Sequence, residues 1–204
     1  MFRSLTIKLL FLAFVLALAL SGRGNLSAQE PIRRWNFPAN DIHGRSITLA
    51  TFINRVTVVS FSTQKSKESD MSLGQEIGQK FGQRRAYQSL AIPNTIDVPL
   101  WAKFVAVLKV KGAENEAVHE ALLRQQAAGN RDITEEEVRR RVIFIHDKDG
   151  SVWERMGVDA RSDRSFIGVI DKTGTLVHLE SMPINKKTFF NVLEEEFDKE
   201  ATAE

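Results

Sequence analysis

The residues best suited to chemistry lie in one polar stretch, "TQKSKESD", which begins at Thr63. It follows an apolar, β-branched run at 56–61 that predicts a buried strand, and it leads into a helical pattern. Ser66, Lys67 and Ser69 therefore sit at a strand-to-helix turn, where the free N–H groups of a helix start can bind an anion or a peptide carbonyl. A serine here can also simply cap the helix, which is worth about 1 kcal/mol. Helix capping alone and ligand binding are both compatible with this turn.

A second chemistry would be hydrolysis, with Ser66 as the nucleophile. Such an enzyme needs a base within hydrogen-bond reach of the serine, and no G-x-S-x-G motif is present to expose it. The chain offers four histidines as bases: His43, His119, His146 and His178. A hydrolase that brings one of them to Ser66 is the alternative to a binding site.

The sequence predicts no metal site and no cofactor. The histidines are widely spaced, and no cluster of carboxylates accompanies them. The stretch "DKDGS" resembles the start of a calcium-binding loop, but Val158 occupies the place where such a loop needs glutamate. We interpret it as a turn.

The first 28 residues are typical of a secretory signal peptide. Arg3 and Lys8 precede an unbroken apolar run at 9–20, and small residues ending in "LSA" follow. Twelve apolar residues are fewer than the roughly 20 that a transmembrane helix needs. We expect cleavage after about Ala28 and a periplasmic protein; an uncleaved signal that tethers the protein to the membrane is the alternative.

Removing this leader changes the charge balance. It takes away three basic residues and no acidic one, which leaves 25 basic and 26 acidic residues and a net charge of −1. A nucleic-acid surface would need a net basic face, so no nucleic-acid partner is expected. The chain also has no cysteine, which excludes disulfides, thiol chemistry and attachment of a lipid to cysteine.

A strand and a helix must position the turn. Apolar residues recur four apart on the predicted helix, and so do glycines on an adjacent stripe. The glycines predict close packing of this helix against a sheet, because each costs the helix roughly 1 kcal/mol relative to alanine. The apolar stripe is Leu73, Ile77 and Phe81, and the glycine stripe is Gly74, Gly78 and Gly82.

A helical insertion is expected at about 98–141. Two apolar runs separated by Gly112 predict its first part, and Thr134 with Glu137 predicts a capping box at the start of a further helix. The three arginines at 139–141 are expected to form a solvated face.

The remaining elements predict the fold class. Strands are expected at 87–93, 142–147, 166–171 and 175–180, and helices at 151–158 and 185–197. This order favours an α/β fold, a three-layer α/β/α sandwich with a mixed central sheet and helices on both faces. We expect residues 29–204 to form a single domain.

This order and spacing resemble the thioredoxin-like superfamily. In its redox members a buried strand runs into C-x-x-C at a helix start, and the two cysteine positions fall on Ser66 and Ser69. The cis-proline position of that family falls on Ser165, before "FIGVID". The leader, the turn "TQKSKESD" and the stretch from "VIFIHDKDG" to "TLVHLE" also resemble the cysteine-free YtfJ family of periplasmic proteins.

The resemblance implies that this chain keeps the strand–turn–helix arrangement of a redox active site without its two cysteines. We expect a redox-inactive binding module that holds an envelope protein or peptide through Ser66, Lys67, Ser69 and Ser165. Trp153 is a further candidate interface anchor, although a tryptophan in this setting is more often a core residue. The helical insertion competes with the turn as the binding surface.

Overall fold

A mixed β-sheet forms the centre of the protein, whose computed structural model describes residues 33–63, 67–99 and 102–199. The sheet has the strand order β1-β8-β7-β4-β5-β6, and β2 and β3 form a separate hairpin. The strands are β1 (Arg33–Arg34), β2 (Ala39–Asn40), β3 (Ser46–Ile47), β4 (Val56–Ser62), β5 (Tyr87–Pro93), β6 (Val142–Phe144), β7 (Phe166–Ile170) and β8 (Thr175–Ser181).

Strand β4 lies inside the sheet and sets its register. It pairs in parallel with β5 along its whole length and antiparallel with β7, and β5 pairs in parallel with β6. The parallel strands β4, β5 and β6 therefore end at the same edge. The β4–β7 register places Phe61 opposite Phe166, so the residues just beyond them, Thr63 and Ser165, come to this edge.

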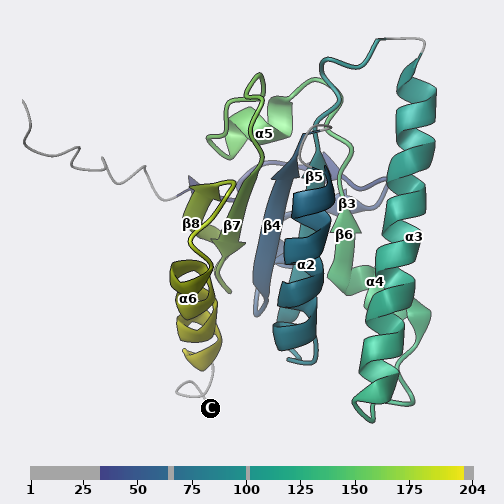
Figure 1. Cartoon of the computed structure of the whole chain (residues 1–204), viewed down its shortest axis with the longest axis vertical. Coiled ribbons are helices and arrows are strands. Elements are labelled where there is room, and N and C mark those ends of the chain that lie inside the picture. The colour runs from purple at the N-terminus through teal and green to yellow at the C-terminus, as the bar shows by residue number, and fades with distance from the viewer. Residues whose placement is uncertain (1–32, 64–66, 100–101, 200–204) are drawn as a thin grey trace, which may run out of the picture. The chain divides into compact units, whose positions relative to one another are not determined.

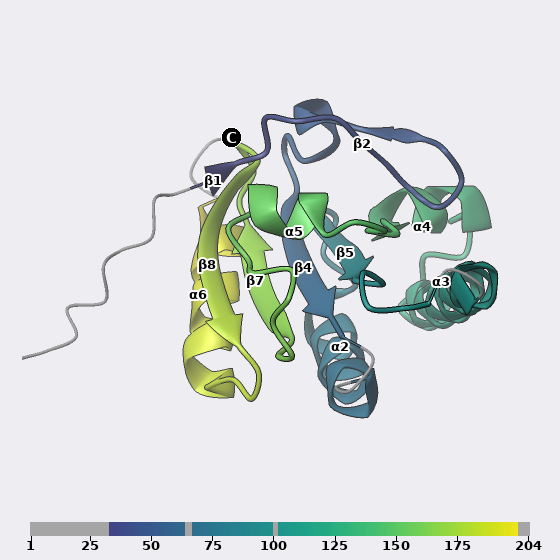
Figure 2. The same ribbon diagram turned by 90° about the horizontal axis from the view of Figure 1, so that it is seen from above.

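Helices cover both faces of the sheet, as the predicted three-layer sandwich requires. Figure 2 shows α2 and α5 on opposite faces, and in Figure 1 the helices α6, α2 and α3 run across the view in that order. No helix in the described ranges has the length and hydrophobicity needed to cross a bilayer. The helices are η1 (Leu49–Thr51, 3-10), α2 (Lys67–Phe81), α3 (Lys103–Ala127), α4 (Glu135–Arg141), α5 (Ser151–Arg155) and α6 (Lys186–Asp198).

The alternation of side chains along β4 creates two cores. Val59 and Phe61 pack on the α5 side with Trp153. Val56 and Val58 face the opposite side and pack with α2 and α6. Both faces of β4 are covered, which explains why its sequence is almost continuously apolar at 56–61.

The predicted helical insertion consists of α3 and α4. Helix α3 runs through Gly112, so this glycine does not divide the insertion into two helices. A Cβ at Gly112 would meet nothing within 4 Å, so no close contact requires glycine there. The predicted capping box is confirmed: the Thr134 hydroxyl accepts from the Glu137 N–H at 3.2 Å, and the Glu137 carboxylate accepts from the Thr134 N–H at 2.9 Å. Val138 of α4 then packs with Val118 of α3.

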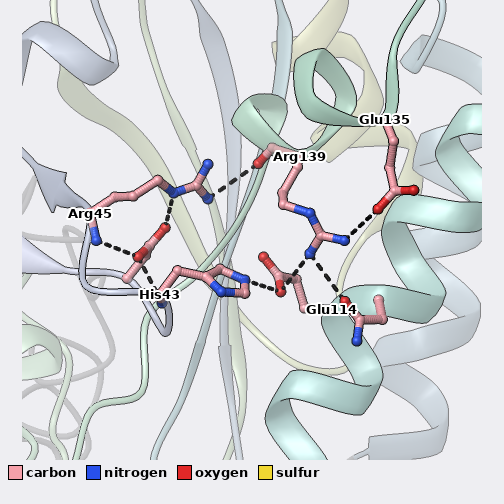
Figure 3. A network of polar contacts seen from close by, with 7 residues as sticks. His43, Arg45, Glu114, Glu135 and Arg139 are labelled. Atoms are coloured by element: carbon pink, nitrogen blue, oxygen red, sulfur yellow. Dashed lines mark hydrogen bonds and ion pairs between the residues drawn. The ribbon is translucent and has the colours of Figure 1, made fainter.

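A buried carboxylate ties α3 to α4 and to the β2–β3 hairpin (Figure 3). Glu114 of α3 is fully buried; its Oε2 accepts from Arg139 Nη1 at 3.1 Å and lies 2.6 Å from His43 Nε2. Arg45, paired with Asp41 in the same hairpin, donates to the Arg139 carbonyl at 3.4 Å. The network fixes one side of α3 and leaves its other side facing α2.

Candidate functional site

The predicted binding turn begins where β4 ends. Ser66 lies outside the described residues, and Lys67 and Ser69 occupy the first turn of α2. Ser165 is buried directly before β7, and its hydroxyl accepts from the Thr63 N–H at 3.0 Å. Ser165 is therefore next to the residue from which the chain enters the turn.

A cis peptide bond lies beside Ser165 in space. It joins Met182 to Pro183 after β8, and the Met182 N–H donates to the Ser165 carbonyl at 2.8 Å. Ser165 itself occupies the position before β7 where the resemblance places the family's proline.

Trp153 does not anchor an interface. Its side chain is 0 % exposed, its Nε1 donates to the Ile92 carbonyl at 2.9 Å, and its ring meets Phe61 edge-on. The suggestion that Trp153 contacts a partner is wrong, because the sheet and α5 enclose it.

A cavity of about 540 Å³ lies between α2, α3 and one face of the sheet. Strands β4, β5 and β6 form its floor. One end reaches Thr63 and Thr95, at the edge that carries the predicted turn, and the other end reaches Tyr87 and Arg141, where β5 and β6 begin. This volume is typical of a site that holds one small molecule.

Small side chains on all three walls create the cavity. Protein interiors are normally close-packed, so a hollow of this size reflects the residues that surround it. The floor contributes Ser60, Ser62, Ser89 and Ala91; α2 contributes Gly74 and Gly78; and α3 contributes Ala106, Ala113, Ala117 and Ala121. The available sequence signal was the alternation of small residues on one face of both β4 and β5.

The glycine stripe of α2 lines this cavity. A Cβ at Gly74 would meet nothing within 4 Å, and a Cβ at Gly78 would meet the Arg124 guanidinium of α3 at 3.3 Å. The expected close packing of this stripe on the sheet is therefore wrong. The apolar stripe behaves as predicted and is buried: Leu73, Ile77 and Phe81.

One long side of the cavity carries a polar bridge between α2 and α3. Gln75 Nε2 donates to Glu120 Oε1 at 3.4 Å, and Arg124 Nη1 pairs with Glu120 Oε2 at 3.3 Å. Arg124 thus has its charge matched by a carboxylate on its own helix. Lys109 and Glu116 of α3 also line the cavity.

The three arginines at the end of α4 differ in their surroundings. Arg140 is 70 % exposed and pairs with Glu136, as expected for a solvated face. Arg139 instead turns inward to Glu114, and Arg141 lines the cavity. The prediction of one solvated face is wrong for these two residues, because α3 and the sheet cover them.

Arg141 lacks a close counter-charge. Within the described residues, no carboxylate lies at ion-pair distance from its guanidinium. Burial lowers the pKa of Arg141, and the positive charges of Arg55 and Arg85 lower it further, while Glu137 acts in the opposite direction. This end of the cavity is therefore electropositive.

Tyr87 stands at the same end of the cavity. Burial raises its pKa to about 12, against a smaller opposing effect of Arg124. Tyr87 is half-buried, and it lines the cavity. Its phenol stays neutral at physiological pH and can donate a hydrogen bond.

His146 lies two residues beyond β6, which ends at Phe144, so the predicted strand at 142–147 is too long. Its Nε2 lies 2.7 Å from the buried hydroxyl of Thr95, and the neighbouring Asp147 accepts from the Val152 and Trp153 N–H groups at the start of α5. Burial raises the pKa of the Asp147 carboxyl. A hydrolase would need such a histidine at Ser66, which lies outside the described residues, so that alternative stays a prediction.

The described residues contain no group of three or more histidines and carboxylates that could hold a metal ion. The cavity is lined by hydroxyl, apolar, guanidinium, ammonium and carboxylate groups.

Comparison with known proteins supports the fold. No family model and no curated protein matches the chain. Among solved structures, the pneumococcal exposed lipoprotein thioredoxin Etrx1 of Streptococcus pneumoniae strain TIGR4 is similar, with TM-score 0.50 and 17 % identity over 78 % of this chain and 98 % of that one. A protein of Neisseria meningitidis assigned to the thioredoxins has TM-score 0.50 and 15 % identity over 85 % and 92 %. The fold is thioredoxin-like, as the sequence predicts.

Proposed function

We propose that this chain is an exported, redox-inactive thioredoxin-like protein that binds an organic ligand in the cavity between α2 and α3. The observation that carries the proposal is the cavity itself, which is walled by small residues from β4, β5, α2 and α3 and reaches the edge of the predicted turn. Catalysis by a thiolate is excluded, because the chain has no cysteine. Binding is the role that the remaining groups support.

The proposed location follows from the leader. Residues 1–28 have the charge, the apolar run and the small residues of an export signal. A solved structure of the same fold is an exposed lipoprotein, which is compatible with export. From this export signal and the absence of cysteine, we propose that the chain is a periplasmic protein of the YtfJ type.

The turn at 66–69 is proposed as a second contact, for an envelope protein or peptide. Its start is held by Ser165, which accepts the Thr63 N–H. A charge-reversed Lys67→Glu variant should lose a partner that crosslinks to the native protein in its envelope fraction while keeping its thermal unfolding midpoint. Unchanged crosslinking would remove the turn from the proposal.

Native mass spectrometry tests cavity binding. The full chain, expressed in cells that export it and isolated without detergent or denaturant, is expected to carry a ligand in a 1:1 ratio. Ala113→Phe should abolish this adduct, because its side chain lies on the α3 wall. Ala127→Phe is the matched control, since Ala127 is exposed at the end of the same helix.

Two results would contradict the proposal. One is a chain that never carries a ligand and takes up none of a panel of small apolar and amphiphilic molecules. The other is an adduct that survives in the folded Ala113→Phe variant, because the ligand would then occupy a different site.

A further inference from the structure

The electropositive end of the cavity points to the class of ligand. Arg141 lines the cavity where β6 begins, and its α4 neighbours Arg139 and Arg140 both have carboxylate partners. Glu137, the nearest acid to Arg141 in sequence, is engaged by Thr134, from which its carboxylate accepts two hydrogen bonds. Among the described residues, two of the three arginines thus have a carboxylate partner and the cavity-lining one has none.

Two further guanidinium groups add to this charge. Arg55 and Arg85 precede β4 and β5, and Arg55 donates to the Arg85 carbonyl at 2.7 Å, which places both at the edge where the parallel strands begin. Both lower the pKa of Arg141, as like charges do at short range. An anion at this end would relieve this repulsion and restore the solvation that burial removes.

The rest of the cavity is suited to an apolar chain. Glycine, alanine, valine, leucine, isoleucine and phenylalanine line much of it, beside several serines and threonines, and it runs along β5 from Tyr87 toward Thr95. At about 3.3 Å per residue, this part of the strand is on the order of 20 Å long. The walls therefore line an elongated space, and Arg141, which has no carboxylate partner among the described residues, lies at one end of it.

The other charged groups along the cavity are less suited to an anion than Arg141. Arg124 is paired with Glu120, and Glu116 on the same wall would repel a carboxylate. Lys109 of α3 also lines the cavity, but its side chain is exposed to solvent, whereas Arg141 is half-buried. Arg141, beside the neutral phenol of Tyr87, is the group best suited to hold an anionic head.

We propose that the cavity binds a single-chain carboxylate amphiphile, with its carboxylate on Arg141 and its hydrocarbon chain directed along β5 toward Thr63. This inference rests on the proposed cavity-binding function and specifies its ligand. The planar guanidinium can donate two parallel hydrogen bonds to the carboxylate, and the apolar walls remove the chain from water.

A head-group comparison tests this inference. The full chain is titrated with dodecanoate and with dodecanol, its neutral counterpart of equal chain length, and binding is followed by native mass spectrometry and calorimetry. The wild-type protein should bind one dodecanoate per chain at least tenfold more tightly than dodecanol. Arg141→Gln should reduce dodecanoate affinity to that of the alcohol, and Arg140→Gln, the exposed neighbour, should leave the ratio unchanged.

The outcomes separate the two proposals. Equal affinity for dodecanoate and dodecanol, or an unchanged ratio in Arg141→Gln, would overturn the carboxylate assignment while cavity binding stands, provided that Ala113→Phe blocks uptake. If the wild-type protein, shown by native mass spectrometry to carry no co-purified ligand, takes up neither molecule, both proposals are overturned. Should Arg141→Gln fail to fold, Arg141→Lys takes its place. Lysine keeps the positive charge but cannot donate two parallel hydrogen bonds, so we expect a dodecanoate affinity between those of the wild type and of dodecanol.

Discussion

At the scale of single residues, a hydroxyl group ties the predicted turn to the neighbouring strand. Ser165 supplies an acceptor to the Thr63 N–H, joining the end of β4 to the start of β7 at the edge of the sheet. A proline at position 165 would have no such hydroxyl. The serine therefore contributes a contact of its own at this position.

The Ser165→Ala variant should be less stable by about 1 kcal/mol, because it removes the acceptor of a partly buried hydrogen bond. Urea unfolding followed by tryptophan fluorescence measures the change. Ser72→Ala, at an exposed position of α2, is the control and should change stability by less than about 0.5 kcal/mol. Equal effects of the two substitutions would show that the Ser165 hydroxyl makes no net contribution.

Tyr87 reports on the cavity because it is the one tyrosine of the chain. Its pKa is raised from 10.0 to about 12, so between these values the unfolded state loses its proton first and the free energy of unfolding falls as pH rises. Tyrosinate absorbance should show the higher pKa in the folded protein and the ordinary one in urea. Tyr87→Phe should remove this part of the pH dependence; a folded-state pKa near 10 would contradict the buried setting.

At the scale of elements, α2 and α3 both carry small residues where they line the cavity. The glycines of α2 and the alanines of α3 face each other across the cavity, and each glycine weakens its helix. A helix selected for stability alone would carry alanine at Gly74, where a Cβ meets nothing. The glycines instead preserve space, which supports a ligand site.

Replacing Gly74 with alanine should therefore stabilise the protein by about 0.5–1 kcal/mol, and Gly112→Ala should do the same in α3. Gly174→Ala should have the opposite effect, since Gly174 has φ +79° and its Cβ would approach a Leu49 methyl group to within 2.3 Å. Urea unfolding midpoints compare the three variants. A loss of stability in Gly74→Ala would mean that the helix packs more closely than described.

At the scale of the whole molecule, stability is expected to be uneven. Strand β4 is hydrogen-bonded on both sides and covered on both faces. Helix α3 belongs to a separate, small core with α4 and β6, and Val105 and Leu108 on its first half are about half exposed. The cavity lies between α3 and α2, and the Glu114 network ties the opposite side of α3 to α4 and the β2–β3 hairpin.

Hydrogen–deuterium exchange should follow this order. Amides of β4 should exchange slowest, and amides of α3 should exchange faster through local opening, because fewer buried contacts hold that helix. Helix α6 serves as the internal control, since three of its apolar side chains are buried in a main core. A ligand in the cavity should slow exchange in α3 more than in α6; equal protection of α3 and β4 without ligand would contradict the expected order.

The sequence by itself determined the absence of thiol chemistry, because composition alone decides it, and the order of strands and helices, because each is encoded by a local pattern. The resemblance to thioredoxin-like proteins pointed to Ser165, but its contact with Thr63 was seen only in the structure. Only the tertiary structure revealed the cavity, the partners of Arg139 and the unmatched charge of Arg141. These depend on neighbours such as Gly78, Ser89 and Ala113, which are far apart in the chain and meet only when the sheet forms.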